Sequence, residues 1–261
     1  INQEPHLHLD PIDHCPGVDG AVEGGHAIEN QPLQHQQGHH ERRPDRQGSG
    51  LGKQMIHAGI AWLRGRGART IGLETMPRTI ENIGFYSRLG FVPRHLTVTL
   101  VHDLARRPAL HPEVLSAAGP ARAERLKACG DLTERLMPGT DFTREQVATA
   151  DLRIGDTLLV RDGAGVLAGF ALYHTAPLAA GRPQDELRIL KLVARDAETF
   201  ERLIVAAEAA ALAADIRRVT IRSQTAFGAP YLRLVLCGYR THWTDLRMTL
   251  DGHGEAQTPS E

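Results

Sequence analysis

Three glycines at every second position, directly ahead of a helical pattern, are the residues in this chain best suited to chemistry. They are Gly48, Gly50 and Gly52, within RRPDRQGSGLGKQMI at 42–56. The apolar residues that follow recur at helical spacing, which predicts a helix over 51–66. Main-chain N–H groups at a helix start attract anions, and glycine leaves them accessible. The pattern therefore indicates a phosphate-binding turn; a flexible hinge leading into the helix is the alternative.

This turn does not match either of two familiar phosphate-binding motifs. A P-loop needs Gly, four residues, Gly-Lys, then Ser or Thr, but Gln47 and Gln54 occupy the first and last positions. A dinucleotide fingerprint needs G-x-G-x-x-G after a strand, whereas here G-x-G-x-G follows a polar stretch. The ligand must therefore be inferred from the wider context of the turn.

Composition narrows the class of protein. The 261 residues are 41% hydrophobic and 23% charged with a net charge of −1, which permits a substantial core and predicts neither a nucleic-acid partner nor a membrane partner. No segment has the length of a bilayer span or the pattern of a signal peptide. Three widely spaced cysteines, Cys15, Cys129 and Cys237, fit reduced thiols and predict a cytoplasmic protein.

The first 47 residues differ from the rest in composition. They lack Phe, Tyr and Trp but hold seven of the fourteen histidines. Such a segment buries little apolar surface, so poor order is expected. The histidine spacing matches no ligand motif, and no metal site is predicted. The histidines are His6, His8, His14, His26, His35, His39 and His40.

A strand, a helix and a second strand are expected to follow the glycine turn. The strands are predicted over 70–75 and 95–104, and the helix over 79–91. Thr79, together with Asn82, is the expected N-terminal cap, and Gly90 is the expected C-terminal stop. The helix should direct inward Ile80, Ile83 and Leu89.

The second half of the chain has a longer series of predicted elements. Three prolines make 105–120 a connector. Asp196 is the expected cap of a long helix, with Glu198 in its first turn. The predicted helices lie at 120–136, 142–150 and 196–215, and the predicted strands at 156–162, 165–175 and 186–194, before a final strand, helix and strand.

An internal repeat links the two halves. RTIGLET, FYSRLGF and LTVTL within 69–100 match RRVTIRS, YLRLVLCGY and LRMTL within 217–250, at an offset of about 148 residues. Each copy follows a helix of similar size. This order predicts two copies of one α/β unit. Where the first copy should have its leading strands, the chain reads ENQPLQHQQGHHE, which does not resemble a sheet.

The glycine turn together with ENIGFYSRLGF resembles the Gcn5-related N-acetyltransferase (GNAT) superfamily. The pattern Gln/Arg-x-x-Gly-x-Gly/Ala is met by QGSGLG at 47–52, and an Asn followed by Tyr-x-x-x-Gly-Phe is met by Asn82 and YSRLGF at 86–91. The resemblance covers about 42–100 closely and 120–250 by element order. It implies an α/β (α+β) fold of two GNAT-like mixed-sheet units in tandem, the first incomplete.

The resemblance implies that acetyl-CoA is the co-substrate. The pyrophosphate would lie on Gln47, Gly48, Ser49, Gly50, Leu51, Gly52 and Lys53. Lys53 would add a charge-assisted contact, or is a solvated lysine of the first turn. Asn82 resembles the family position beside the pantetheine arm, and its local role as a helix cap is compatible with that.

Tyr86 resembles the family tyrosine that protonates the departing CoA thiolate, because an amine attacks the thioester carbonyl directly. The alternative is a tyrosine packed beside Phe85 and Phe91. Glu74 would help to deprotonate the amine, or is an exposed carboxylate at a strand end.

The chain departs from the family pattern in both halves. No strand precedes the glycine turn, so we expect a first domain that is truncated, or an N-terminal stretch translated in the wrong frame. In the second copy Leu234 occupies the place of Tyr86, and Asp196 and Glu198 would repel a pyrophosphate. The second domain is then structural or substrate-binding, and could complete the first by pairing strands with it.

The predicted organisation has five parts: an atypical segment 1–41, a partial GNAT domain 42–104 with the acetyl-CoA motif, a connector 105–120, a second GNAT-like domain 121–251, and a disordered tail 252–261. The predicted activity is acetyl transfer from acetyl-CoA to a primary amine. The acceptor is a small molecule or a protein N-terminus, and an oligomer is compatible with the sequence. The alternative is a non-catalytic remnant that acts as a binding or interaction module.

Overall fold

A computed structural model describes residues 49–105, 111–178, 181 and 183–252. The predicted histidine-rich segment, Gln47, Gly48 and most of the C-terminal tail lie outside these residues. Two units divide the chain, 1–58 and 59–261. The described part of the first unit is a bend at Ser49 and Gly50 followed by the start of helix α1 (Leu51–Gly65), which agrees with the predicted helix.

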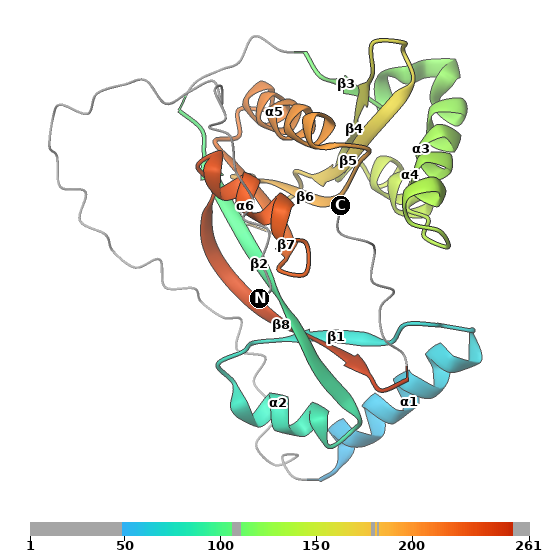
Figure 1. Ribbon diagram of the computed structural model, residues 1–261, viewed down its shortest axis with the longest axis vertical. Coiled ribbons are helices and arrows are strands. Elements are labelled where there is room, and N and C mark those ends of the chain that lie inside the picture. The colour runs from blue at the N-terminus through green and yellow to red at the C-terminus, as the bar shows by residue number, and fades with distance from the viewer. Residues whose placement is uncertain (1–48, 106–110, 179–180, 182, 253–261) are drawn as a thin grey trace, which may run out of the picture. The chain divides into compact units, whose positions relative to one another are not determined.

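The second unit contains one mixed sheet of eight strands (Figure 1). Its strand order is β1-β8-β2-β7-β6-β5-β4-β3; among the described residues β6 and β7 pair in parallel and the other neighbouring strands pair antiparallel. The strands are β1 (Gly72–Thr75), β2 (Phe91–Asp103), β3 (Glu113–Val114), β4 (Gly155–Arg161), β5 (Leu167–His174), β6 (Leu187–Ala194), β7 (Arg218–Gln224) and β8 (Arg240–Leu250).

Five further helices connect these strands at positions close to the predicted ones. They are α2 (Ile80–Ser87), α3 (Arg122–Leu136), α4 (Thr143–Asp151), α5 (Ala197–Ala213) and α6 (Gly228–Leu236). Asp196 caps α5 as predicted, because its carboxylate accepts a hydrogen bond from the Thr199 amide at 2.8 Å. The predicted connector contains β3 and a 3-10 turn, η2 (Ser116–Ala121).

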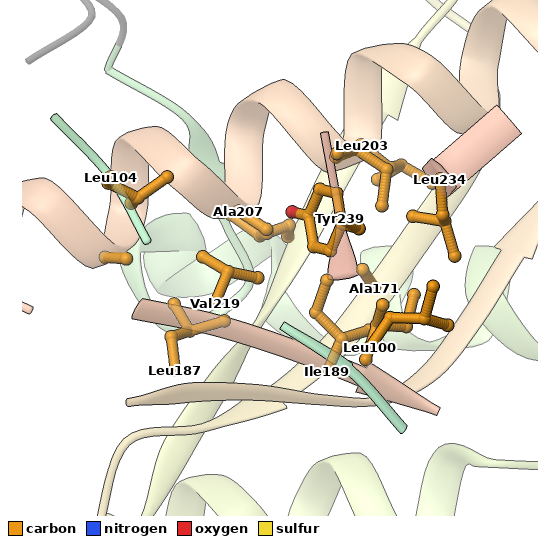
Figure 2. Packing of buried hydrophobic residues seen from close by; sticks show 14 of the residues in the cluster. Leu100, Leu104, Ala171, Leu187, Ile189, Leu203, Ala207, Val219, Leu234 and Tyr239 are labelled. Atoms are coloured by element: carbon orange, nitrogen blue, oxygen red, sulfur yellow. The ribbon is translucent and has the colours of Figure 1, made fainter. Parts of the chain in front are cut away.

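The core lies on both faces of the sheet. Alternate residues of a strand point to opposite faces, and Leu158 and Val160 of β4 belong to the cluster that α5 covers. Leu159, between them, belongs to a second cluster beneath α3. Figure 2 shows the centre of the α5 cluster, with strand and helix side chains around Tyr239. The long apolar runs of β4 and β5 thus reflect burial on two sides.

The first helix after β1 is shorter than the predicted range 79–91, because α2 ends at Ser87, and it differs in two further details. Ile80 is 76% exposed rather than inward, because it lies at the first position of α2, where the helix has only begun. Thr79 precedes the helix but its side chain makes no capping hydrogen bond. Its main-chain carbonyl instead accepts from the amides of Asn82 and Ile83. Gly90 ends this segment with φ +88°, as a stop glycine should.

Strand β2 begins earlier than predicted, at Phe91 rather than at 95. Pro93 obscured the pattern, because proline has no N–H to give a ladder and is unusual within a strand. The pairing with β8 accommodates it by a register shift between Pro93 and Leu96. The strand therefore starts directly after Gly90.

The strand pairing is symmetric between the two repeated segments. Glu74 and Arg222 stand 148 positions apart. The same offset relates the β1–β8 pairs to pairs between β7 and β2. Leu73 pairs with Met248, and the equivalent Ile221 pairs with Leu100. All four β1–β8 pairs reappear in this way as β7–β2 pairs. In addition, Thr97 and Asp245 are equivalent residues that pair with each other.

Strands from the two repeated sequence segments therefore alternate in the sheet. Strand β8 lies between β1 and β2, and β2 lies between β8 and β7. Figure 1 shows β2 and β8 running along each other. Strands of the segment 121–251 thus pair with strands of the segment 42–104, which the sequence analysis gave as one possibility.

A cluster of polar side chains links strand β2 to helix α5 and to Tyr239, just before β8. Glu208 Oε1 of α5 accepts from the Tyr239 hydroxyl at 3.1 Å and lies 3.0 Å from His102 Nδ1. At the equivalent positions of the other copy stand Ile60, Phe91 and Leu250, all buried. The hydrogen bond to Glu208 raises the pKa of His102 above its ordinary value.

Replacing His102 by Leu, the residue at the equivalent position 250, should make stability less dependent on pH. A raised pKa means that protonated His102 stabilises the fold fully below its unfolded pKa, and that this contribution is lost as pH rises through the folded pKa. The stability difference between the wild type and His102→Leu, measured by urea unfolding, should thus be larger at about pH 5.5 than at about pH 8.5.

Glu208→Gln serves as the control for this comparison. It should flatten the pH dependence in the same way, because it removes the charge that His102 faces. Asp103 and Arg240 also lie near His102 and remain in every variant. An equal stability difference at both pH values would show that the His102 contact has no role in the pH dependence.

Candidate functional site

A bend at Ser49 and Gly50 precedes α1 in the described part of the glycine turn. Gly50 has φ +76°, a left-handed conformation that side chains with a Cβ rarely adopt. The Gln54 amide donates to the Gly50 carbonyl at 3.1 Å and closes the first turn. Among the described residues, nothing lies within 4 Å of a Cβ built at Gly50, so conformation rather than crowding requires glycine there.

The amides at the start of α1 are available to a ligand as far as the described residues show. None of these residues accepts a hydrogen bond from the amides of Leu51, Gly52 or Lys53. The first turn also contains no acidic residue. Unpaired amides at the positive end of a helix dipole favour an anion. The turn therefore has the means to bind phosphate groups.

Tyr86 lies on α2 within a small aromatic group. Its ring meets those of Phe85 and Phe91 edge to face, with centroids 5.2 Å and 6.1 Å away. Phe91 is buried, whereas Tyr86 itself is only partly covered. The packing holds the ring while leaving it partly exposed, so both interpretations of this tyrosine are compatible with its surroundings.

Asn82 lies in the first turn of the same helix. The main-chain amide of Asn82 donates a hydrogen bond to the Thr79 carbonyl at 3.1 Å, and Asn82 is partly buried. Because the predicted Thr79 side-chain cap is not made, capping does not account for the polar residues at this helix start. Asn82 therefore stays a predicted ligand-binding residue.

The contacts of Glu74 favour a structural role over that of a base. Its carboxylate accepts hydrogen bonds from Thr97 Oγ1 at 2.8 Å and from Arg222 Nη2 at 2.5 Å. Burial alone would raise the pKa of Glu74, but these bonds and the Arg222 charge outweigh it and hold the pKa below its ordinary value. Asp245 binds the same guanidinium at 2.8 Å. A carboxylate held as an ion pair is a weak proton acceptor.

Replacing Glu74 by Gln should therefore leave the rate of the acetyl transfer predicted from the sequence within about threefold of the wild-type value, whereas loss of a general base costs roughly a hundredfold or more. Stability should fall by up to about 1 kcal/mol, because the Arg222 ion pair is partly exposed. Steady-state rates and urea unfolding of the same preparation separate the two effects. A hundredfold loss of rate without loss of stability would restore the catalytic interpretation.

The start of α5, which the repeat predicted from the sequence aligns with the start of α1, is capped by the chain's own carboxylate. Asp196 caps the Thr199 amide. Hydrogen bonding with the Thr199 side chain, followed by the bond from the Thr199 amide, lowers the pKa of Asp196 to about 2. Arg195 links it to Asp162, at 3.1 Å and 2.8 Å respectively. Leu234, at the place equivalent to Tyr86, is buried. These contacts agree with the prediction that the second copy lacks the features of the cofactor motif.

The sequence reasoning did not identify two strand residues that contact the segment carrying Glu74 and Tyr86. Arg222 and Leu250 come from the second copy but contact the segment 71–91 of the first. The repeat offset could have pointed to these residues, because it places Glu74 and Arg222 at equivalent positions, where they carry opposite charges. Within the described ranges, no three potential ligand side chains gather as a metal site would require. No described helix has both the length and the apolarity to cross a bilayer.

Comparison with protein families gives a match for one part of the chain. Residues 42–91 match the model of the acetyltransferase (GNAT) family. This segment contains the glycine turn, Asn82 and Tyr86. No curated protein matches the chain.

Three solved structures share the fold at low sequence identity. A GCN5-related N-acetyltransferase from Sphaerobacter thermophilus is 17% identical with a TM-score of 0.50, over 84% of this chain and 71% of that one. A putative acetyltransferase from Pyrococcus horikoshii is 18% identical with a TM-score of 0.54, over 83% and 64%. A tandem GNAT protein from the clavulanic acid biosynthesis pathway is 14% identical with a TM-score of 0.53, over 82% and 73%.

The chain thus spans less than two thirds of the Pyrococcus protein and about seven tenths of the other two. It has the mixed α/β fold of GNAT-related acetyltransferases, and its residues 42–91 carry the sequence signature of that family.

Proposed function

We propose that this protein is an N-acetyltransferase that transfers an acetyl group from acetyl-CoA to a primary amine. The observation that carries the proposal is the family match at 42–91, in a segment whose helix-start amides have no partner among the described residues. The proposed acceptor is a small-molecule amine or a protein N-terminus. We further propose a cytoplasmic location, with which the buried thiol of Cys129 agrees.

The glycine-rich stretch from Gln47 to Lys53 would bind the diphosphate of acetyl-CoA. Main-chain amides supply several donors at once, and glycine at position 50 permits the left-handed turn that exposes them. Lys53, in the first turn of α1, would add a positive charge. Asn82 would bind the pantetheine arm with its amide group.

Tyr86 would act as the general acid. The amine nitrogen attacks the thioester carbonyl carbon, the carbon–sulfur bond breaks, and the electron pair remains on sulfur. The Tyr86 hydroxyl gives its proton to that thiolate, while the amine loses a proton to water. A proton donor at the leaving group lowers the barrier because a free thiolate need not form.

We also propose a tandem arrangement, with one cofactor site in the copy at 42–104 and none in the copy at 121–251. The symmetric ladder supports two equivalent copies. The occupied start of α5 and the buried Leu234 support a second copy without its own cofactor.

Calorimetric titration with acetyl-CoA, combined with an assay of CoA release over a panel of amines, tests the proposal. Binding with turnover on at least one amine class supports the transferase. Binding without turnover on amino sugars, polyamines, amino acids or peptide N-termini would favour the non-catalytic binding module. Absence of binding would exclude acetyl-CoA as the ligand.

A further inference from the structure

The end of strand β8 lies against both ends of the segment that carries Tyr86. The chain runs from β1 through α2 to β2, yet β1 and β2 do not pair, because β8 lies between them (Figure 1). Helix α2 therefore spans two strands whose separation depends on a strand from the other copy. Contacts that hold β8 between β1 and β2 therefore also hold the two ends of α2 in place.

Main-chain hydrogen bonds hold β8 at this place. The Leu250 amide donates to the Ile71 carbonyl at 2.8 Å, just before β1. The Asp251 amide donates to the Gly90 carbonyl at 2.9 Å, just after α2. One dipeptide thus binds the chain on both sides of the helix.

The Leu250 side chain extends this contact toward Tyr86. It is 5% exposed, and its Cδ1 lies 3.5 Å from the Cβ position at Gly90. Leu250 is the ladder partner of Phe91, and directly opposed residues of an antiparallel pair lie side by side. Phe91 in turn meets the Tyr86 ring edge to face. A continuous path of packing joins Leu250 to the proposed acid.

We propose that Leu250 is a positioning residue for acetyl transfer, supplied by the second copy to the proposed acid of the first. It acts through Phe91 and Gly90 on the orientation of the Tyr86 hydroxyl. This inference rests on the proposed function. It gives the second copy, which lacks features of the cofactor motif, a role in the reaction that the first copy would carry.

The chain provides its own matched control for this role. His102 is the equivalent of Leu250 at the end of β2, and its Nε2 lies 3.7 Å from the Cβ position at Gly238. Its ring approaches Tyr239, the equivalent of Phe91, with centroids 5.0 Å apart. Leu234 stands where the acid would be, so the same packing has no hydroxyl to position.

The test is a double-mutant cycle between Leu250→Ala and Tyr86→Phe, with rates of CoA release and calorimetric affinity for acetyl-CoA. Leu250→Ala should lower kcat about tenfold or more, because small misplacements of a catalytic group are costly. Acetyl-CoA affinity should stay within about threefold, since a positioning residue for the acid acts on the chemical step. In the Tyr86→Phe background the same change should have no further effect on kcat.

Two further variants guard against a loss that reflects only folding. Leu250→Met keeps the volume and should restore at least half of the rate, and His102→Ala should leave kcat within about twofold. An equal loss of kcat from Leu250→Ala in both backgrounds, or a parallel loss of affinity and kcat, would overturn the positioning role alone. Absence of turnover in the wild type would overturn the proposed function, and this inference with it.

Discussion

Replacing Tyr86 by Phe should lower the rate of acetyl transfer by roughly a hundredfold to ten thousandfold, which is the range for loss of a positioned general acid. The affinity for acetyl-CoA should stay within about threefold, because the ring, rather than the hydroxyl, makes the contacts with Phe85 and Phe91. Stability should change little for the same reason. Steady-state kinetics, calorimetry and urea unfolding on one preparation measure the three quantities.

Tyr231→Phe is the control for this prediction. Tyr231 lies on α6, the counterpart of α2, and is also partly covered. The change removes the same oxygen from the equivalent helix, so it should leave turnover within about twofold. A loss of acetyl-CoA affinity with unchanged kcat in Tyr86→Phe would assign Tyr86 to binding, and an unchanged rate would leave it as an aromatic packing residue.

Most single elements could be predicted from the sequence because their signals are local. The 3.6-residue period located α1 and α5 to within two residues, and alternating or continuous apolar runs located β4, β5 and β6. Asp196 was recognised as a cap from its place before the helix, and its carboxylate makes that bond. Hydrogen bonds and burial within one segment decide such features.

Local sequence patterns fail to predict a feature where the conformation of one segment depends on contacts with a segment distant in the sequence. Pro93 conceals the start of β2, which only the pairing with β8 makes visible. Ile80 matched the apolar period but lies at the helix start, where nothing covers most of its surface. The alternation of strands from the two repeated segments is the largest example. Two copies that each hold strand, helix and strand could pair within themselves or with each other, and periodicity is the same in both cases.

The candidate site likewise combines features that local motifs predict with contacts that they do not predict. The glycine turn and Tyr86 are predicted from short motifs, and Gly50 has a left-handed backbone conformation that favours glycine. Leu250, the ladder partner of Phe91 beside Tyr86, comes from a distant part of the sequence for which no short motif exists. Glu74 illustrates the effect, because its partner Arg222 lies 148 positions along the chain and turns a candidate base into half of an ion pair.

Replacing Gly50 by Asp should reduce the affinity for acetyl-CoA by about a hundredfold or more. A carboxylate at the start of α1 would occupy the amides itself and repel a diphosphate, and at about 4 Å each pair of like charges costs roughly 4 kcal/mol near a protein surface before screening by solvent and salt. Stability should fall by less than about 1.5 kcal/mol, since Asp tolerates the left-handed conformation better than most residues. Calorimetric titration with acetyl-CoA measures the affinity directly.

Gly67→Asp separates charge at the helix start from strain in the backbone. Gly67 follows the other end of α1, has φ +75°, and, among the described residues, nothing lies within 4 Å of its Cβ position, as at Gly50. The two substitutions therefore add the same side chain to the same conformation, but only Gly50→Asp places it at the positive end of the helix dipole. If both variants bind acetyl-CoA as the wild type does, the diphosphate does not lie on this turn; if both lose binding equally, backbone strain rather than occupation of the amides is the cause.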